Sequence, residues 1–151
     1  MILSAQTIRR YGIITPFCER TVFNGLSYGL SSCGYDVRIN EFMLFRGALQ
    51  FGLASTIEHF EMPNNVVGRV HDKSTWARRG LAIQNTIIEP GWKGFLTLEL
   101  SNNNHNNTLR IEEGSPIAQI IFELLDEPTE TPYSGKYQDQ PNWPVNAKLE
   151  G

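Results

Sequence analysis

Gly94-Phe95-Leu96-Thr97-Leu98-Glu99-Leu100 alternates its side chains with a period of two, which is the pattern of a β-strand. One face of this strand carries the three leucines, and the other carries Phe95, Thr97 and Glu99. Burying an unpaired carboxylate is costly, so Glu99 either faces solvent or lies in a pocket. In a pocket, desolvation would raise the pKa of Glu99 and make it a usable proton shuttle.

The chain around this strand is divided into short segments by 13 glycines and eight prolines. Few of these segments are long enough for a sustained helical period, so we expect a mainly β domain, such as a sandwich, barrel or jelly roll. Helices are expected only from Ser4 to Tyr11, closed by Gly12, and over a short piece at 74–79. The expected strands are 35–45, 51–56, 66–70, 81–85, 94–100, 109–111 and 117–125.

Composition limits the class of protein. The 151 residues predict one domain, 1–151. The formal net charge of -3 argues against a nucleic-acid partner. The sequence has no long apolar run, and its N-terminal stretch carries a charged pair, so we expect a cytoplasmic protein with no membrane partner. Cys18 and Cys33 lack metal or redox spacing and are expected to be free thiols.

A second polar feature is the turn Lys73-Ser74-Thr75-Trp76-Ala77-Arg78-Arg79-Gly80. Ser74 and Arg78 are four residues apart, so on a helical turn they share a face. With the free N–H groups at the start of the turn, they could bind a phosphate. An ordinary capped helix with a solvated arginine face explains the same residues equally well.

Two further polar side chains stand beside predicted strands. Glu89, in the turn before residue 94, is either a turn residue or a second carboxylate on the pocket of Glu99. Gln119 shares a strand face with Ile117 and Ile121, where its amide needs a partner. That partner is either a cross-strand group or a sugar or base.

From Asp126 onward the chain becomes polar and rich in proline, glycine and glutamine. We expect residues 126–151 to form an arm with little core of its own. Tyr133, Lys136 and Gln140 supply a phenol, an ammonium group and an amide that could close over a phosphorylated ligand. A disordered tail is the alternative.

Zinc deaminases of nucleosides need H-x-E followed by P-C-x-x-C. His59-Phe60-Glu61 matches the first half, but both cysteines precede His59 and the second half is missing. The match is therefore interpreted as chance, within an acidic turn before Pro63. Any deamination by this chain is expected to proceed without zinc.

Five segments are informative when they are taken in order: Tyr28-Gly29-Leu30-Ser31-Ser32-Cys33-Gly34-Tyr35-Asp36-Val37-Arg38, the turn at 73–80, Glu89-Pro90-Gly91-Trp92-Lys93-Gly94 through Glu99, Pro116-Ile117-Ala118-Gln119, and Gly135-Lys136-Tyr137-Gln138-Asp139-Gln140. Together they resemble the dCTP deaminase family, in the trimeric dUTPase-like superfamily, from about residue 2 to 140. The resemblance implies a distorted jelly-roll or β-clip subunit. It also implies a homotrimer with interfacial sites, and hydrolysis of dCTP to dUTP and ammonia for pyrimidine deoxynucleotide synthesis.

The same resemblance implies residue roles. Glu99 matches the glutamate that activates the water attacking C4 of cytosine, Ser74 lies near that position and the phosphates, and Arg78 supports the transition state. Substrate contacts are implied for Lys73, Thr75, Glu89, Gln119, Tyr133, Lys136 and Gln140. Mg²⁺ would accompany the triphosphate, with no protein side chain as its ligand.

Two other functions fit the same fold. In dUTPases an acidic residue in the turn before the strand activates water against the α-phosphate, and Glu89 occupies that place. A dUTPase, or a bifunctional enzyme acting on dCTP and dUTP, is therefore one alternative, although the tail lacks the glycine-rich arm usual in dUTPases. A non-catalytic trimeric nucleotide-binding module is the other.

The chain also departs from the family pattern, because Glu89 replaces a common Asp and the stretch between Leu81 and Glu89 is short.

Overall fold

The computed structural model describes residues 1–46, 50–104 and 106–151. The helices in these ranges are α1 (Ala5–Tyr11) and α2 (Ser74–Ala77). The strands are β1 (Ile14–Thr15), β2 (Thr21–Phe23), β3 (Leu26–Leu30), β4 (Tyr35–Arg38), β5 (Met43–Phe45), β6 (Gln50–Glu61), β7 (Val66–Asp72), β8 (Leu81–Ile83), β9 (Ile87–Ile88), β10 (Lys93–Asn102), β11 (Leu109–Ile111) and β12 (Pro116–Leu124).

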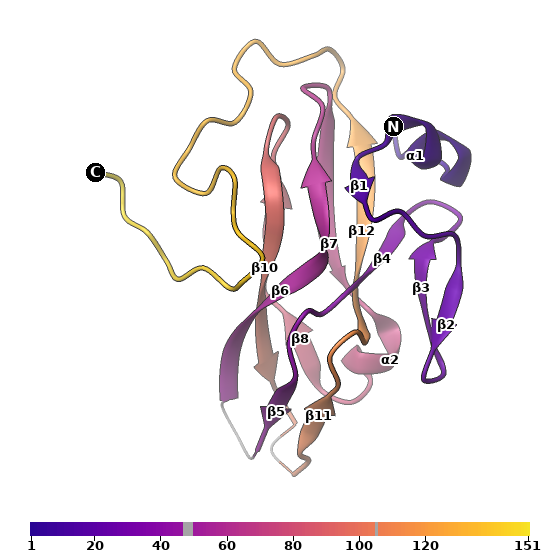
Figure 1. The fold of residues 1–151 in the computed structure, drawn as a ribbon, viewed down its shortest axis with the longest axis vertical. Coiled ribbons are helices and arrows are strands. Elements are labelled where there is room, and N and C mark those ends of the chain that lie inside the picture. Colours follow the sequence, from indigo (N-terminus) through magenta and orange to yellow (C-terminus); the bar gives the residue numbers. More distant parts are fainter. Residues whose placement is uncertain (47–49, 105) are drawn as a thin grey trace.

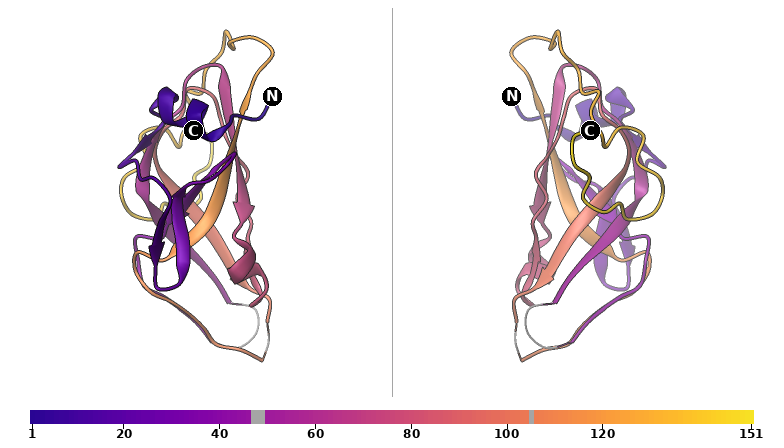
Figure 2. Two further views of the ribbon diagram at one scale, coloured as in Figure 1. Left: turned by 90° about the vertical axis from the view of Figure 1, so that its right-hand side faces the viewer. Right: turned by 90° about the vertical axis from the view of Figure 1, so that its left-hand side faces the viewer.

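Two antiparallel sheets make up most of the fold. One has the strand order β1-β6-β10-β8 and the other the order β2-β3-β4-β12-β7-β9, while β11 pairs with β5. The long strands β6, β7, β10 and β12 run along the length of the molecule, and their sheets twist across one another in the side views (Figures 1 and 2). This mainly β architecture of curled antiparallel sheets confirms the expected fold class and is consistent with a distorted jelly roll.

The core lies between the two larger sheets. Leu98 and Leu100 of β10 are fully buried, as the alternating pattern requires, and Ile120 and Phe122 of β12 are buried in the facing sheet. Each fully buried side chain of this size contributes about 1.5–3 kcal/mol. The strand that carries Glu99 is therefore anchored by its leucine face.

One ion pair also joins the two sheets. Glu58 of β6 is completely buried and accepts hydrogen bonds from Nε of Arg38 (2.8 Å) and from its backbone N–H (2.9 Å). The guanidinium of Arg38 also lies 4.5 Å from the ring centroid of Tyr28. Burial raises the pKa of Glu58, and the bonds from Arg38 oppose that rise. This pair could not be predicted from the sequence, because the predicted strand ended at residue 56.

β6 corrects the interpretation of His59-Phe60-Glu61 as an acidic turn. The strand continues to Glu61 because Phe60 is fully buried and the His59 ring packs edge-on against Phe95, with ring centroids 5.0 Å apart. The expected strand 35–45 is likewise too long. It is divided into β4, which ends at Arg38, and β5, which begins at Met43.

The N-terminal helix forms where expected, and Gly12 ends it in the left-handed conformation, with φ of 64°. Ser4 precedes the helix, but its side chain does not cap it: its hydroxyl lies 3.2 Å from Oγ1 of Thr7. Both cysteines are free thiols, as expected. Among the described residues, no helix combines the length and the apolar character needed to cross a bilayer.

Residues 126–151, all of which the structure describes, leave β12 and descend beside β10 as an extended tail (Figure 1, orange to yellow). None of these residues is buried, although Tyr133 packs against the core. The tail is nevertheless attached. Trp92 Nε1 donates to the Tyr137 carbonyl (2.6 Å), and the Asp139 N–H donates to the Lys93 carbonyl (2.9 Å).

Candidate active site

A cavity of about 520 Å³ lies where β10 meets the tail and the segment between β8 and β10. β10 and β6 supply one wall, the segment 85–92 supplies another, and residues of the tail between 133 and 147 supply a third. The lining residues are Phe51, Leu53, Asn85, Thr86, Ile87, Glu89, Trp92, Leu96, Thr97, Glu99, Tyr133, Tyr137, Gln140, Val145, Asn146 and Ala147.

Glu99 is half-buried in this cavity, which decides between the two alternatives for its strand face. Desolvation by burial raises the pKa of its carboxyl group. A carboxylate with a raised pKa takes up a proton more readily near neutral pH than an exposed one does. This environment makes Glu99 a candidate general base.

The strand face that carries Glu99 is less regular than simple alternation predicts. Thr97 lies with Glu99 on the cavity, but Phe95 packs against His59, and Leu96 lines the cavity instead. The cause is a register shift between Phe95 and Thr97 in the pairing of β10 with β6. The side chains of β10 alternate between the two faces as predicted only from Thr97 onward.

Glu89 also lines the cavity, which is one of the two positions that the sequence left open for it. Glu89 is exposed and also borders a second, more open hollow of about 420 Å³ that includes Arg69 and Thr129. The better buried of the two carboxylates is Glu99. The two groups thus occupy different electrostatic environments within one cavity.

Two of the three predicted tail residues reach the cavity. Gln140 lies next to β10: its carbonyl accepts from the Phe95 N–H (3.0 Å), and its Oε1 accepts from Oγ1 of Thr97 (3.2 Å). The Thr97 hydroxyl in turn accepts from the Val145 N–H (3.1 Å). Tyr133 lines the cavity, and its hydroxyl accepts from the Tyr137 N–H (3.0 Å).

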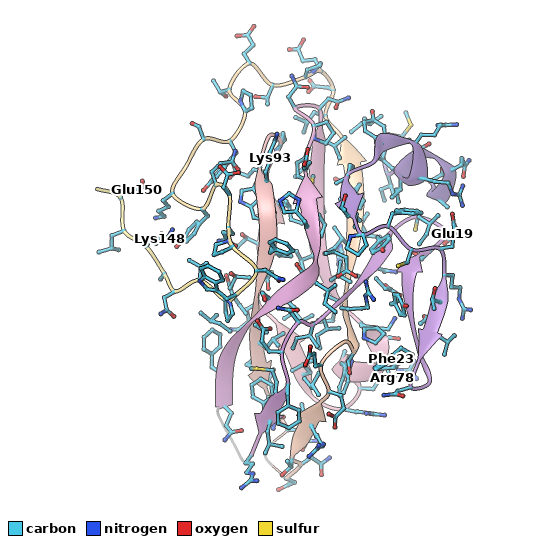
Figure 3. All side chains as sticks on the ribbon, viewed as in Figure 1. Glu19, Phe23, Arg78, Lys93, Lys148 and Glu150 are labelled. Carbon is cyan, nitrogen blue, oxygen red and sulfur yellow. The ribbon has the colours of Figure 1, made fainter. Side chains whose placement is uncertain are left out.

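Lys136 is not among the residues that line the cavity. Its Nζ lies 3.2 Å from Oε1 of Glu150 and 5.5 Å from the ring centroid of Tyr137. Lys148 and Glu150 lie at the outer end of the tail (Figure 3). The ammonium group that was expected to bind phosphate therefore forms an ion pair with a carboxylate.

The helical turn α2 lies apart from this cavity. Ser74 and Arg78 are exposed and share one turn, with the Arg78 N–H donating to the Ser74 carbonyl (3.1 Å), and Thr75 is half-buried beside them. Arg78 is on the opposite side of the view from Lys148 and Glu150 (Figure 3). Within one copy of the chain, neither Ser74 nor Arg78 lines the cavity that holds Glu99.

Lys73 and Gln119 belong to a third location, on β4, β12 and β7. Nζ of Lys73 lies 2.7 Å from Oδ2 of Asp36, and both side chains are mostly buried. Gln119 is opposite both Asp36 and His71 in the sheet register, and its amide contacts Oγ of Ser31 at 3.5 Å. Oδ1 of Asp36 is buried without a partner among the described atoms.

The sequence missed several residues of the cavity. Asn85, Tyr137 and Val145 come from a strand end and from the tail, where no periodic pattern identifies a wall residue. Thr97 could have been found, because it shares the predicted face of Glu99. Within 1–46, 50–104 and 106–151, no three His, Cys, Asp or Glu side chains gather in a way that could hold a metal ion.

Comparison with known proteins identifies related chains. The family model for dCTP deaminase-like domains matches residues 37–125. The curated dCTP deaminase of Campylobacter fetus subsp. fetus is 38% identical over 160 residues, covering 85% of this chain and 86% of the relative.

Solved structures agree with the fold. The dCTP deaminase of Agrobacterium tumefaciens has a TM-score of 0.62 at 17% identity, covering 82% of this chain, which spans 48% of that longer chain. A dUTPase variant from phage phi11 of S. aureus, whose structure describes a structural Mg(II) ion, has a TM-score of 0.56 at 18% identity and covers 69% and 84% of the two chains. The fold is therefore dUTPase-like.

Proposed function

The chain belongs to the dCTP deaminase family, and on that premise we propose that it is an enzyme that hydrolyses dCTP to dUTP and ammonia. The observation that carries this proposal is Glu99, a half-buried carboxylate in a cavity of about 520 Å³ whose pKa is raised by burial. A module that only binds nucleotide does not need such a group. The non-catalytic alternative is therefore disfavoured.

Glu99 has two tasks in the proposed reaction. It first takes a proton from a water molecule as the water oxygen forms a bond to C4 of cytosine. It then returns that proton to the amino group, and the bond between C4 and this nitrogen breaks to release ammonia. The second proton of the water moves from the oxygen on C4 to N3, which gives uracil. Water supplies the new oxygen, and Glu99 ends the cycle ionised as it began.

Ser74 and Arg78 enter this site from a neighbouring copy of the chain in our proposal. Their separation from Glu99 within one copy supports an assembly with interfacial sites, and a homotrimer is the assembly that the family resemblance implies. In that assembly Ser74 would lie near C4 and the phosphates, and Arg78 would stabilise negative charge that develops in the transition state.

The tail and the sheet supply the proposed substrate contacts. We infer that residues 1–151 form one domain in which 126–151 closes over the nucleotide, with Lys136 exchanging Glu150 for phosphate oxygens. Tyr133 and Gln140 already lie on the cavity. Phosphate or sugar contacts from Lys73, Thr75 and Gln119 would come from the sheet and from α2.

Mg²⁺ would reach this site with the triphosphate. The described residues offer cations for phosphate and no cluster of carboxylates for a metal, so phosphate oxygens and water would be the ligands of the ion. When bound, the ion neutralises phosphate charge. Zinc independence remains a prediction from the missing P-C-x-x-C motif.

A second activity, hydrolysis of dUTP to dUMP and pyrophosphate, is favoured by the position of Glu89 on the same cavity. Because Glu89 is exposed, it would act on a water molecule nearer the opening, where the phosphates enter. In this bifunctional alternative the two carboxylates act on different atoms of one nucleotide. A small nucleotide, with no nucleic acid or membrane, is the proposed partner, and the cytoplasm is the proposed location.

The test is incubation of the protein with dCTP and Mg²⁺, with the nucleotide products separated and ammonia assayed. Equal amounts of dUTP and ammonia are expected, and Glu99→Gln should abolish turnover while dCTP affinity stays within about tenfold. Turnover by Glu99→Gln within a few-fold of the wild type would remove Glu99 from its role. Parallel incubation with dUTP tests the second activity through the release of dUMP.

A further inference from the structure

Asn85 makes an unusual connection to the strand that carries Glu99. The pairing of β8 with β10 covers only Leu81–Ile83, and the Gln84 N–H then donates to the Glu99 carbonyl (2.8 Å). Beyond Gln84 the backbone leaves the sheet to form the cavity wall. At this point the side chain of Asn85 continues the pairing in place of the backbone.

Two hydrogen bonds define this contact. Nδ2 of Asn85 donates to the Thr97 carbonyl (2.7 Å), and Oδ1 of Asn85 accepts from the Glu99 N–H (2.9 Å). An N–H group can only donate and a carbonyl can only accept, so these two partners fix which amide atom faces which strand residue. The two bonds take the place of main-chain ladder bonds at Thr97 and Glu99, on either side of Leu98.

We propose that Asn85 is a positioning residue that holds the backbone of Thr97 and Glu99 and so sets where the Glu99 carboxylate stands in the cavity. This inference rests on the proposed deaminase function for its catalytic consequence. The geometry itself does not depend on that function. Asn85 also lines the cavity, so it holds Glu99 from within the site.

The side-chain contact allows the chain after β8 to form a cavity wall, which a longer β8 would prevent. A backbone ladder continued to residue 85 would keep the chain beside β10, whereas the amide side chain holds β10 while the chain crosses to β9, which pairs with β7. Thr86, Ile87 and Glu89 then line the cavity along this crossing. A displacement of about 1 Å at a catalytic group can reduce the rate about 100-fold. The contact of Asn85 with β10 is therefore expected to influence the chemical step more than substrate binding.

The test compares Asn85→Ala and Asn85→Asp with the wild type. Gln84→Ala is the matched control, because that exposed side chain does not line the cavity and its backbone bond survives the substitution. Asn85→Ala should lower kcat by about 10- to 100-fold, with KM changed by less than about threefold. Gln84→Ala should match the wild type.

The acid limb of the pH–rate profile and the titration of the Glu99 carboxyl carbon by NMR give a second readout. In Asn85→Ala, water can enter beside the released strand, so both should move to lower pH. Asn85→Asp keeps the acceptor for the Glu99 N–H but adds a negative charge, so both should move to higher pH. A fall in thermal stability without these opposite shifts, or an unchanged kcat in Asn85→Ala, would overturn the inference. If the wild type does not deaminate dCTP, the proposed function fails, and the NMR titration still decides the role of Asn85.

Discussion

Replacing Thr97 by valine should weaken the attachment of the tail to β10 around Val145 without changing the volume of the side chain much. The hydroxyl donates to Gln140 at 3.2 Å and accepts from the Val145 N–H at 3.1 Å. Both distances are at the long end for such bonds, and each bond contributes about 0.5–1.5 kcal/mol net. Taking the lower half of that range, the loss is about 1–2 kcal/mol, which corresponds to a roughly 5- to 30-fold weaker attachment.

Hydrogen exchange measured by mass spectrometry or NMR detects this change directly. The amide of Val145 should exchange about 5- to 30-fold faster in Thr97→Val than in the wild type. The amides of Leu98 and Leu100, which lie in the paired and buried part of β10, should keep their wild-type rates. Thr108→Val is the control, because Thr108 is exposed and lies outside both the cavity and the tail.

An unchanged exchange rate at Val145 would refute the reasoning, because the hydroxyl would then not hold the tail. An equal acceleration at Val145 and at Leu98 would also refute it. That result would mean that the substitution destabilises the whole domain instead of releasing the tail.

Three further predictions concern the core, the carboxylate and the tail. Arg38→Met leaves the buried carboxylate of Glu58 unpaired and should lower the free energy of unfolding in urea by about 3–5 kcal/mol; a loss below about 1 kcal/mol would contradict the pairing. Because the pKa of Glu99 is raised, its ionised form destabilises the fold above that pKa, and the penalty disappears below its ordinary value. Glu99→Gln should therefore raise the melting temperature at about pH 8, by an amount that shrinks as the pH falls, and a pH-independent gain would contradict this. Deleting 132–151 should leave the assembly and its melting temperature nearly intact but remove most dCTP turnover, as light scattering and a steady-state assay will show.

The strand predicted at 94–100 shows which structural features a local sequence pattern can predict. Its period of two predicted the buried leucines and the shared face of Thr97 and Glu99, because alternation is a local property of the chain. The same reasoning failed at Phe95 and Leu96, since the register shift there depends on the partner strand. The short strands β1, β2, β3 and β9 were missed because two to five residues carry little periodic signal.

The sequence identified candidate site residues but did not predict where each of them lies relative to the cavity. A shared cavity was one of the alternatives for Glu89 and Glu99, and both residues line the same cavity. Lys136 was expected near phosphate but pairs with Glu150, and Ser74 is exposed away from the cavity. The contact of Asn85 with β10 could not be predicted from the sequence. A side chain that bonds to the backbone of another strand can lie at any distance along the chain from its partner.

The most direct test of hydrolytic deamination is turnover of dCTP in water labelled with oxygen-18. If water attacks C4 of cytosine, one labelled oxygen appears in the uracil ring of dUTP for each ammonia released, and the phosphates of that dUTP carry none. Mass spectrometry of the base and of the phosphates separates these positions. Label found only in the phosphate of a monophosphate product, with the cytosine amino group retained, would contradict the account.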